Sequence, residues 1–352
     1  MSEKELRTAV LGLKEEGEGL LETIAGSEHY KLIAVADKDS ELVERVAQRY
    51  GCSAFDDYRQ FVIGNELDVL VVAAGLYSCE QYVKSAIRKK FNILKVPPAG
   101  RDFGEAVELA KLAEENEVIF TVASAQRFSK KYSVLREFVE QQEERPLLIT
   151  AVCSYSRQTR PAWYGDPKLA GGGVLLRDCY GFIDELVLAF GVPEQVYSTN
   201  TNMAADRQQR HALTEDIAVV VMRFSDNFCV NLVAKRSSGE NEKSETLELY
   251  YRNKVVTVSD SSLTAVDVEG KKLKSKRFGQ DDDSDMCQML ESFALGCLVP
   301  EENKPVSTMR EHLNNMAVIE AAYLSARTRM PEEPGRILAM TDKYTDSRLS
   351  LK

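Results

Sequence analysis

A turn near the start of the chain has the residue types of a dinucleotide-binding loop. An apolar run over residues 7–13 contains Gly12, and Gly17 follows, so the first and third glycines of a Gly-x-Gly-x-x-Gly pattern are present. Lys14 stands where the middle glycine would let the backbone approach a pyrophosphate. Asp37 follows Gly17 by 20 residues. A carboxylate there accepts hydrogen bonds from ribose hydroxyls and repels the extra phosphate of NADP, so the spacing favours NAD.

Two interpretations of this loop stay open. Lys14 could pair with a phosphate, whereas Glu15 and Glu16 place negative charge at a helix start that would otherwise attract an anion. Either the loop binds the nucleotide weakly, or it keeps the turn and has lost the nucleotide. The sequence therefore predicts NAD as the cofactor, weakly bound or lost.

Composition narrows the class of protein. The chain has 352 residues and a formal net charge of −10, and its basic run Arg88–Lys90 is short, so nucleic acid is not expected as a partner. No apolar run approaches ~20 residues, so no membrane association is expected, and the polar start argues against a signal peptide. The seven cysteines show no paired spacing. We therefore expect a cytoplasmic protein without disulfides and without a metal site.

The first part of the chain, residues 1–125, alternates strand and helix patterns. Continuous apolar strands separated by helices predict an α/β Rossmann domain with a doubly wound parallel sheet. Strands are expected at 7–13, 31–37, 69–74, 91–96 and 118–123, and helices at 19–24, 40–50, 78–88 and 102–116. Ser40 is the expected N-cap of the second helix, and Gly51 lies just past its end.

The rhythm changes at about residue 126. Residues 126–330 predict an α+β domain with an open, mainly antiparallel sheet, and residues 331–352 form a polar tail. Strands are expected at 147–155, 196–201, 217–224, 228–234, 245–251 and 255–258, and helices at 130–139, 175–190, 284–296 and 308–327. An uncovered sheet face would expose a large apolar patch, so a homodimer or homotetramer is expected.

Several segments occur in the order and at the spacing of one oxidoreductase family. They are Ile33–Asp37, Val71–Ala74, Gln126–Phe128, the stretch from Trp163 through Gly171–Leu176 to Asp184, and Ile319–Ser325. In this arrangement the chain up to about Arg327 resembles the Gfo/Idh/MocA family, which contains glucose–fructose oxidoreductase and myo-inositol dehydrogenase. The resemblance implies hydride transfer to a nicotinamide cofactor, with Ala74 and Pro97 among the residues that contact the nucleotide.

The departures from the family fall on its catalytic positions. The family's Glu-Lys-Pro aligns with Lys95-Val96-Pro97, and its Asp-x-x-x-His aligns with Arg177 to Gly181. In the family, the lysine, aspartate and histidine bind a hydroxyl-bearing substrate and move its proton. Valine and glycine offer no such group, and arginine stays protonated. Because general acid–base catalysis supplies ~10²–10⁴-fold, losing all three groups should remove most of the ordinary activity.

Some residues could replace the lost groups. Lys95 lies one position early, so its side chain is expected on the opposite face of the strand. Tyr180 and Tyr164 could donate a proton in hydride transfer. Arg177 could instead clamp a substrate, because a guanidinium binds a carboxylate or phosphate through two hydrogen bonds. The candidate catalytic residues are therefore Lys95, Arg177 and Tyr180.

The expected ligand is a small sugar, polyol or carboxylate. Arg127, Trp163 and Tyr164 are the candidate substrate-binding residues. Three functions remain open: a catalytically degenerate member that binds a ligand or regulates a partner, an active NAD-linked oxidoreductase with relocated acid–base groups, or a structural subunit that pairs through its open sheet. The first is favoured, because the departures concentrate on the catalytic positions.

Overall fold

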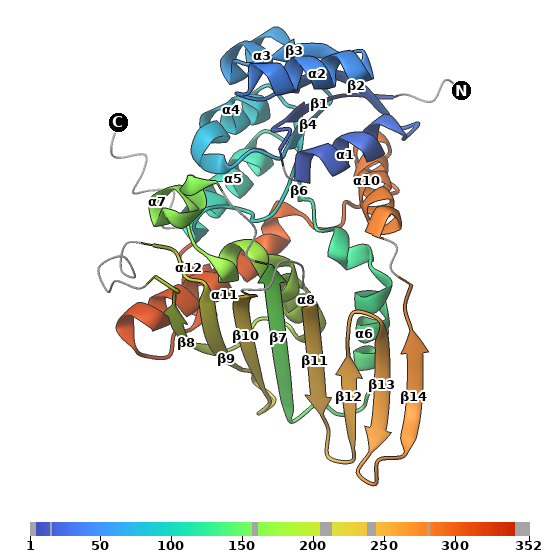
Figure 1. Cartoon of the computed structure of the whole chain (residues 1–352), viewed down its shortest axis with the longest axis vertical. Coiled ribbons are helices and arrows are strands. Elements are labelled where there is room, and N and C mark those ends of the chain that lie inside the picture. The colour runs from blue at the N-terminus through green and yellow to red at the C-terminus, as the bar shows by residue number, and fades with distance from the viewer. Residues whose placement is uncertain are drawn as a thin grey trace. The chain divides into compact units, whose positions relative to one another are not determined.

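The computed structural model describes residues 5–14, 16–156, 161–204, 213–237, 244–279 and 282–341. They form two compact units (Figure 1). The first unit contains residues 1–100, 105–128 and 282–312, and the second contains 101–104, 129–281 and 313–352. Residues 282–312 thus belong to the first unit although they follow the second unit's sheet in the chain. Residues 342–352 of the expected tail lie outside the described part.

The first unit contains a six-stranded, fully parallel sheet in the order β3-β2-β1-β4-β5-β6. Its strands are β1 (Leu6–Leu11), β2 (Tyr30–Ala36), β3 (Ser53–Phe55), β4 (Val69–Val72), β5 (Asn92–Lys95) and β6 (Phe120–Val122). All four residues of β4 are buried, because a parallel sheet is covered on both faces. This confirms the predicted doubly wound architecture.

The helices of the first unit connect its strands and cover the sheet. They are α1 (Glu16–Ala25), α2 (Ser40–Tyr50), α3 (Tyr58–Gly64), α4 (Leu76–Arg88), most of α5 (Phe103–Glu115) and α10 (Asp282–Leu298). The expected N-cap of α2 was wrong by one residue. Asp39 is the cap, and its side chain accepts a hydrogen bond from the N–H of Leu42, 3.2 Å away. Gly51 ends the helix at a φ of +67°, as expected.

Helix α10 belongs to the core of the first unit. Met289, Leu290 and Phe293 are buried in one hydrophobic cluster with residues of β1 and α1. The Tyr30 hydroxyl at the start of β2 donates a hydrogen bond to the carbonyl of Leu290. This contact ties together residues that lie far apart in the sequence, so a late helix completes the packing of the N-terminal sheet.

The second unit contains an eight-stranded sheet in the order β14-β13-β12-β11-β7-β10-β9-β8. Its strands are β7 (Leu148–Ser156), β8 (Gln195–Thr201), β9 (Ile217–Arg223), β10 (Cys229–Ser237), β11 (Ser244–Tyr250), β12 (Lys254–Val258), β13 (Ser262–Asp267) and β14 (Lys272–Arg277). Only β7 and β10 pair in parallel; the other neighbours are antiparallel. The predicted mainly antiparallel sheet is confirmed, and β13 and β14 extend it beyond the expected strands.

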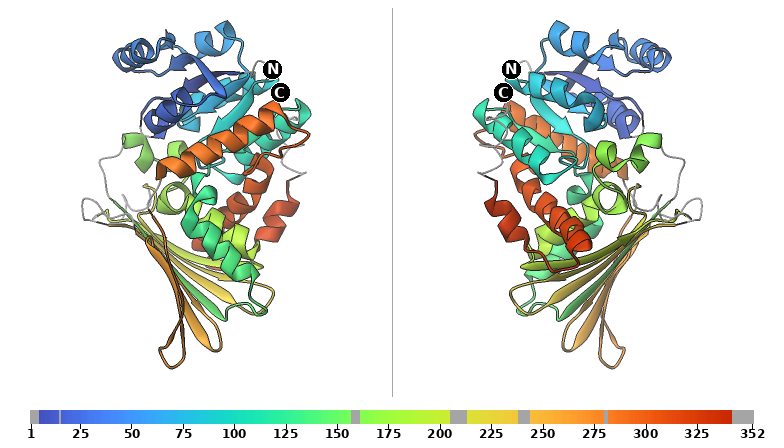
Figure 2. Two further views of the ribbon diagram at one scale, coloured as in Figure 1. Left: turned by 90° about the vertical axis from the view of Figure 1, so that its right-hand side faces the viewer. Right: turned by 90° about the vertical axis from the view of Figure 1, so that its left-hand side faces the viewer.

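Helices cover one face of this sheet and leave the other face open (Figure 2). They are α6 (Lys130–Glu140), α8 (Tyr180–Phe190), α11 (Met309–Thr328, whose first turn counts with the first unit) and α12 (Pro334–Ala339). The strands show the matching alternation of burial. In β7, Ile149, Ala151 and Cys153 are fully buried, whereas Val152 on the opposite face is 41% exposed.

The segment before α8 differs from the single helix expected at 175–190. A short helix, α7 (Pro167–Ala170), precedes the glycine run, and residues Val174–Asp178 form a π-helical turn. Cys179 has a φ of −90° and a ψ of 1°, which separates this turn from α8. Insertions of this kind inside helices occur frequently at functional sites.

Candidate functional site

The two glycines of the nucleotide loop are fixed by close packing in the first unit. Gly12 has a φ of +94°, and a Cβ there would lie 2.4 Å from the backbone nitrogen of Ala74. A Cβ on Gly17 would lie 2.3 Å from the carbonyl oxygen of Gly12. Both contacts are impossible for any other residue, so the turn itself requires the two glycines. Their presence is therefore weaker support for a nucleotide than the motif alone suggests.

The other two loop residues are tied to protein groups. Asp37 is 7% exposed, and its oxygens accept hydrogen bonds from the N–H of Leu13 (2.9 Å) and of Asp39 (3.0 Å). Lys14 Nζ lies 2.9 Å from a carboxylate oxygen of Asp39, and this pairing lowers the pKa of Asp39. Glu15 lies outside the described residues. The Lys14 ammonium therefore has a carboxylate partner within the protein.

The predicted nucleotide contacts lie at one edge of the sheet. Gly12, Asp37, Ala74 and Pro97 follow β1, β2, β4 and β5, and the carboxyl ends of parallel strands meet at the same edge. Nucleotides bind at this edge in doubly wound folds. The turn, the helix start behind it and the Asp37 carboxylate fit an NAD molecule, and Lys14 is the one feature of the set that departs from the pattern.

Neither lysine nor valine of the Lys95-Val96 pair is placed for proton transfer. Lys95 is 2% exposed, and its Nζ donates hydrogen bonds to the carbonyl oxygens of Val96 (2.7 Å) and Pro98. Val96 packs in the hydrophobic cluster that contains Leu13 and Phe293. The two side chains thus lie on opposite faces of the strand end, as the alternation requires. Lys95 holds the backbone of the loop after β5.

Arg127 lies in the first unit and forms an ion pair there. It belongs to a short 3-10 helix at Ala125–Phe128, and its Nη1 lies 2.6 Å from a carboxylate oxygen of Glu311. The backbone N–H of Glu311 donates a hydrogen bond to the Thr308 hydroxyl oxygen, 3.4 Å away. The Thr308 side chain thus caps the start of α11, and the Glu311 carboxylate pairs with Arg127.

Arg177, Trp163 and Tyr164 come together in the second unit. The Arg177 guanidinium carbon lies 4.6 Å from the centre of the Trp163 indole and 5.1 Å from the centre of the Tyr164 ring. The two ring centres are 4.3 Å apart. A cation over aromatic faces is attracted by the ring quadrupole, at about 0.5–2 kcal/mol. The predicted clamp and the two predicted substrate-binding aromatics thus form one cluster, the Arg177 cluster.

Tyr180 is less accessible than a proton donor needs to be. It begins α8 and is 1% exposed, and Gly181 follows it in the same helical turn. Cys179 is fully buried, and its Sγ lies 2.7 Å from that of Cys153. The other tyrosine considered as a replacement, Tyr164, lies with its ring centre 5.1 Å from the Arg177 guanidinium carbon.

Two buried networks of the second unit could not be found from spacing in the sequence. Arg236 on β10 pairs through Nε with Asp178 (3.0 Å) and through Nη1 with Asp216 (2.9 Å). Asp178 is thereby committed to Arg236 rather than to a substrate. Glu245 on β11 accepts hydrogen bonds from the Tyr132 hydroxyl (2.6 Å) and the Tyr155 hydroxyl (3.0 Å).

Burial raises the pKa values of the two tyrosines in the Glu245 network. Lys131 Nζ also reaches Glu245, at 3.1 Å, and Asp260, at 2.8 Å. Burial raises the pKa of Tyr132, and the adjacent Glu245 carboxylate raises it further. Burial likewise raises the pKa of Tyr155. Both phenols therefore stay protonated and donate hydrogen bonds to the Glu245 carboxylate. This buried network lies on the face of the sheet that the helices cover.

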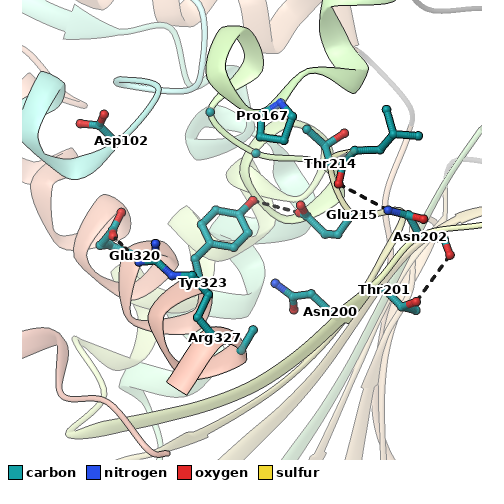
Figure 3. Close-up of a pocket in the computed structure, with 14 residues that line it drawn as sticks. Asp102, Pro167, Asn200, Thr201, Asn202, Thr214, Glu215, Glu320, Tyr323 and Arg327 are labelled. Carbon is teal, nitrogen blue, oxygen red and sulfur yellow. Dashed lines mark hydrogen bonds and ion pairs between the residues drawn. The ribbon is translucent and has the colours of Figure 1, made fainter. Parts of the chain in front are cut away.

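The glycine run that contributes to the resemblance is explained by one buried carboxylate. Glu215 accepts hydrogen bonds from the N–H groups of Gly173 (2.8 Å) and Leu175 (3.0 Å) and from the hydroxyl of Tyr323 (2.9 Å; Figure 3). A Cβ on Gly172 would lie 2.1 Å from that hydroxyl, and one on Gly173 would lie 2.0 Å from the Glu215 carbonyl oxygen. The glycines let the loop close around the carboxylate.

The described residues contain no group of three or more His, Cys, Asp or Glu side chains that could hold a metal ion. Within the same part of the chain, no helix combines the length and the apolar character needed to cross a membrane.

Comparison with known proteins identifies the family. The family model described as "Oxidoreductase family, NAD-binding Rossmann fold" matches residues 6–124, and the model described as "GFO/IDH/MocA C-terminal domain" matches residues 134–257. The two models together cover more than half of the chain, which belongs to the Gfo/Idh/MocA oxidoreductase family. No curated protein sequence matches it significantly.

Solved structures share the fold along nearly the whole chain. An oxidoreductase from Agrobacterium radiobacter, in complex with NAD+, L-tartaric acid and magnesium, is 11% identical, with a TM-score of 0.80 over 95% of this chain and 100% of that one. The WlbA dehydrogenase from Bordetella pertussis, in complex with NADH and UDP-GlcNAcA, is 16% identical, with a TM-score of 0.79 over 94% and 99%. A levoglucosan dehydrogenase, in complex with NADH and levoglucosan, is 14% identical, with a TM-score of 0.81 over the same shares. At these identities the likeness shows the fold alone.

Proposed function

We propose that this chain is a catalytically degenerate member of its family, which binds a small ligand and, more weakly than its relatives, NAD. The observation that carries the proposal is the Arg177 cluster. Arg177 stands where the family has a carboxylate, and its guanidinium is stacked on Trp163 and Tyr164. A guanidinium cannot take a proton from a substrate hydroxyl, because it remains charged at any working pH.

The first unit supports the same proposal. At the family's lysine position, Val96 is part of an apolar cluster. The neighbouring Lys95 ammonium is bound to backbone carbonyls, so it does not take over the missing role. Gly181 offers no side chain at the family's histidine position. The family's lysine, aspartate and histidine positions thus hold Val96, Arg177 and Gly181, and none of these side chains can move a substrate proton.

The ligand class follows from the Arg177 cluster. A guanidinium next to two aromatic rings suits a carboxylate, which it can bind through two parallel hydrogen bonds. The bound ligands of two relatives, L-tartaric acid and UDP-GlcNAcA, carry carboxylates. We infer that a small polyhydroxylated acid is the ligand here. In this role the protein senses a metabolite or regulates a partner rather than oxidising a polyol.

A second candidate function is an active oxidoreductase in which Tyr164 donates the proton. One observation favours it: the Arg177 guanidinium carbon lies 5.1 Å from the centre of the Tyr164 ring, so the phenol stands beside the candidate substrate clamp. In the direction of substrate oxidation, the Tyr164 phenolate would accept the hydroxyl proton as the hydride passes to NAD; in the reverse direction, the phenol would donate that proton. Tyr180, at 1% exposure, is the weaker alternative.

Steady-state kinetics separate the two functions. The protein is incubated with NAD and, in turn, glucose, myo-inositol, levoglucosan and L-tartrate, and reduction of the nicotinamide is followed by absorbance. No turnover above background is expected from the natural chain. The combined variant Val96→Lys, Arg177→Asp and Gly181→His is expected to gain polyol oxidation. Ordinary rates in the unchanged protein would refute degeneracy, and their loss in Tyr164→Phe would establish the second function.

We also propose that the protein is cytoplasmic and forms a homodimer or homotetramer through the open face of the second sheet. All seven cysteines are free thiols, which is usual in a reducing compartment.

A further inference from the structure

The second unit contains a cavity that takes no part in the proposed function. Its volume is about 440 Å³, and it lies between α11, the end of β8 and the loop that carries Gly171 and Gly172 (Figure 3). Neither Arg177 nor the two aromatic residues stacked on it line this cavity. All of its lining residues belong to the second unit. A cavity of this size can enclose a ligand of about ten to fifteen heavy atoms.

One wall of the cavity is an aromatic ring held in a fixed position. The Tyr323 hydroxyl donates to Glu215, which is itself held by the N–H groups of Gly173 and Leu175. Gly172 permits this arrangement, because any side chain there would collide with the hydroxyl. The ring thus presents a preorganised apolar surface to a ligand, at no cost in ordering on binding.

Hydrogen-bond donors surround this ring. The amide oxygen of Asn200 accepts from the Ser198 hydroxyl at 2.8 Å, which fixes the orientation of the amide. Its Nδ2 has no acceptor among the described residues, and in Figure 3 it points toward the space beside Tyr323. Arg327 lies one turn beyond Tyr323 on α11, and its side chain is 70% exposed. Both groups are available to ligand oxygens.

Acceptors line the same space. The Glu320 carboxylate lies 3.8 Å from Arg327 Nη2, so the two form a loose pair beside the ring. Asp102 also lines the cavity; burial raises the pKa of Glu320, and the charge of Asp102 raises it further. With Glu215, three carboxyl groups and one guanidinium line the cavity. An anionic ligand would therefore be repelled, whereas hydroxyl groups would find both donors and acceptors.

We propose that this cavity binds a neutral monosaccharide or polyol, with its ring against Tyr323 and its hydroxyls on Asn200, Glu320 and Arg327. The site would be a second ligand site, since the Arg177 cluster favours an acid. The Thr214 hydroxyl, which lines the cavity, donates to the carbonyl oxygen of Tyr164 at 3.0 Å. This bond gives the sugar site a direct contact with the backbone of the Arg177 cluster.

The first experiment tests the class of ligand on the full-length protein. D-Glucose and myo-inositol are neutral probes, D-gluconate is anionic and D-glucosamine is cationic. Binding is measured by saturation-transfer NMR and by calorimetric titration. At least one neutral probe should bind, and at this site gluconate should bind at least tenfold more weakly. No binding of either neutral probe would overturn the proposal, as would glucosamine binding more than tenfold tighter than glucose.

The second experiment tests the location. Asn200→Ala and Arg327→Gln should each weaken binding of the neutral probe at least tenfold. The matched control Arg336→Gln on α12 should leave it within twofold. Binding that survives both cavity variants, or that is abolished by Arg177→Gln, would place the sugar elsewhere and overturn the proposal.

Hydrogen exchange on the unaltered protein gives a test that does not depend on any variant folding. The neutral probe should slow exchange in peptides that span residues 196–204 and 316–328. It should leave peptides from α6 unchanged. Unchanged exchange in the first two regions at saturating probe would overturn the site even if every variant proved unstable.

Discussion

The Arg177 guanidinium carbon lies 4.6 Å from the centre of the Trp163 ring. Trp163 is the chain's one tryptophan, so its fluorescence reports this contact without interference from another indole. Arg177 departs from the family's catalytic pattern, and Trp163 lies before the glycine-rich segment that leads to Arg177. Trp163 fluorescence can therefore report whether a ligand changes the surroundings of Arg177.

Arg177→Gln is expected to change the emission of Trp163 and to lower the free energy of unfolding by about 1 kcal/mol, because the cation over the ring is lost. L-Tartrate should change the emission of the natural protein and have at least tenfold less effect on the variant. Arg223→Gln, an exposed arginine on β9, serves as the control. An equal response of the variant and the natural protein to tartrate would mean that Arg177 does not bind the acid.

Glu215→Ala tests the carboxylate that organises the glycine run. Its removal leaves two backbone N–H groups and the Tyr323 hydroxyl without their acceptor, and each such loss costs about 1–3 kcal/mol. We expect urea denaturation to show a loss of about 3 kcal/mol or more. Glu140→Ala, at the exposed end of α6, should change stability by less than about 0.5 kcal/mol. Equal effects of the two substitutions would show that the buried network is not a major source of stability.

Much of the fold follows from local patterns, and the exceptions have physical reasons. The continuous apolar run Val69–Val72 predicts a strand buried on both faces, as in a parallel sheet. This pattern, like the position of Asp37 just after β2, can be read from residues that are adjacent in the sequence. Strand β14 was not expected, because it is an exposed edge strand rich in lysine and has no apolar alternation. The cap at Asp39 was missed since two adjacent residues both suit an N-cap.

The candidate site is harder to predict than the fold. The types of Arg177, Trp163 and Tyr164 predict a binding role, and the structure brings the three side chains together. The partners of Glu215 and Arg236 come from other elements, up to 108 residues away, and no spacing in one sequence specifies them. Such pairs depend on how strands and helices pack in three dimensions.

Lys14→Gly tests the nucleotide loop. The substitution removes the side chain that pairs with Asp39 and restores the middle glycine, so the backbone can approach a pyrophosphate. The dissociation constant for NAD, measured by calorimetry, should fall by about tenfold, which corresponds to about 1.4 kcal/mol. Lys14→Ala separates the two causes, because it removes the charge but keeps a Cβ. Tight NAD binding by the natural protein would contradict the argument about this loop.

The thiols of Cys79 and Cys287 should be alkylated at very different rates, and that difference should depend on pH. Burial raises the pKa of Cys79 to about 12, whereas Cys287 is exposed. A raised thiol pKa favours the protonated form, so at pH 8 the thiolate, which is the nucleophile, is scarce at Cys79. Alkylation of the native protein followed by mass spectrometry should modify Cys287 first and should leave Cys79 unmodified until the pH approaches its pKa or the protein unfolds. Rapid modification of Cys79 at pH 8 would mean that the loop after β4 opens.

The open face of the second sheet should hold two copies of the protein together. Thr199, Val219, Val233 and Val152 lie side by side across four neighbouring strands on this face. Of these, Val152 is 41% exposed, which is costly for an apolar side chain in water.

A two-fold contact would bury this row against its own copy, so a single charged residue would be opposed by another like charge. Val152→Lys should therefore convert the oligomer to a monomer in light scattering and lower its midpoint of thermal unfolding. Val268→Lys is the matched control, because Val268 is 78% exposed just past β13 and away from the row. A monomeric natural protein would remove the proposed interface, and dissociation by Val268→Lys alone would move it to the β13–β14 end of the sheet.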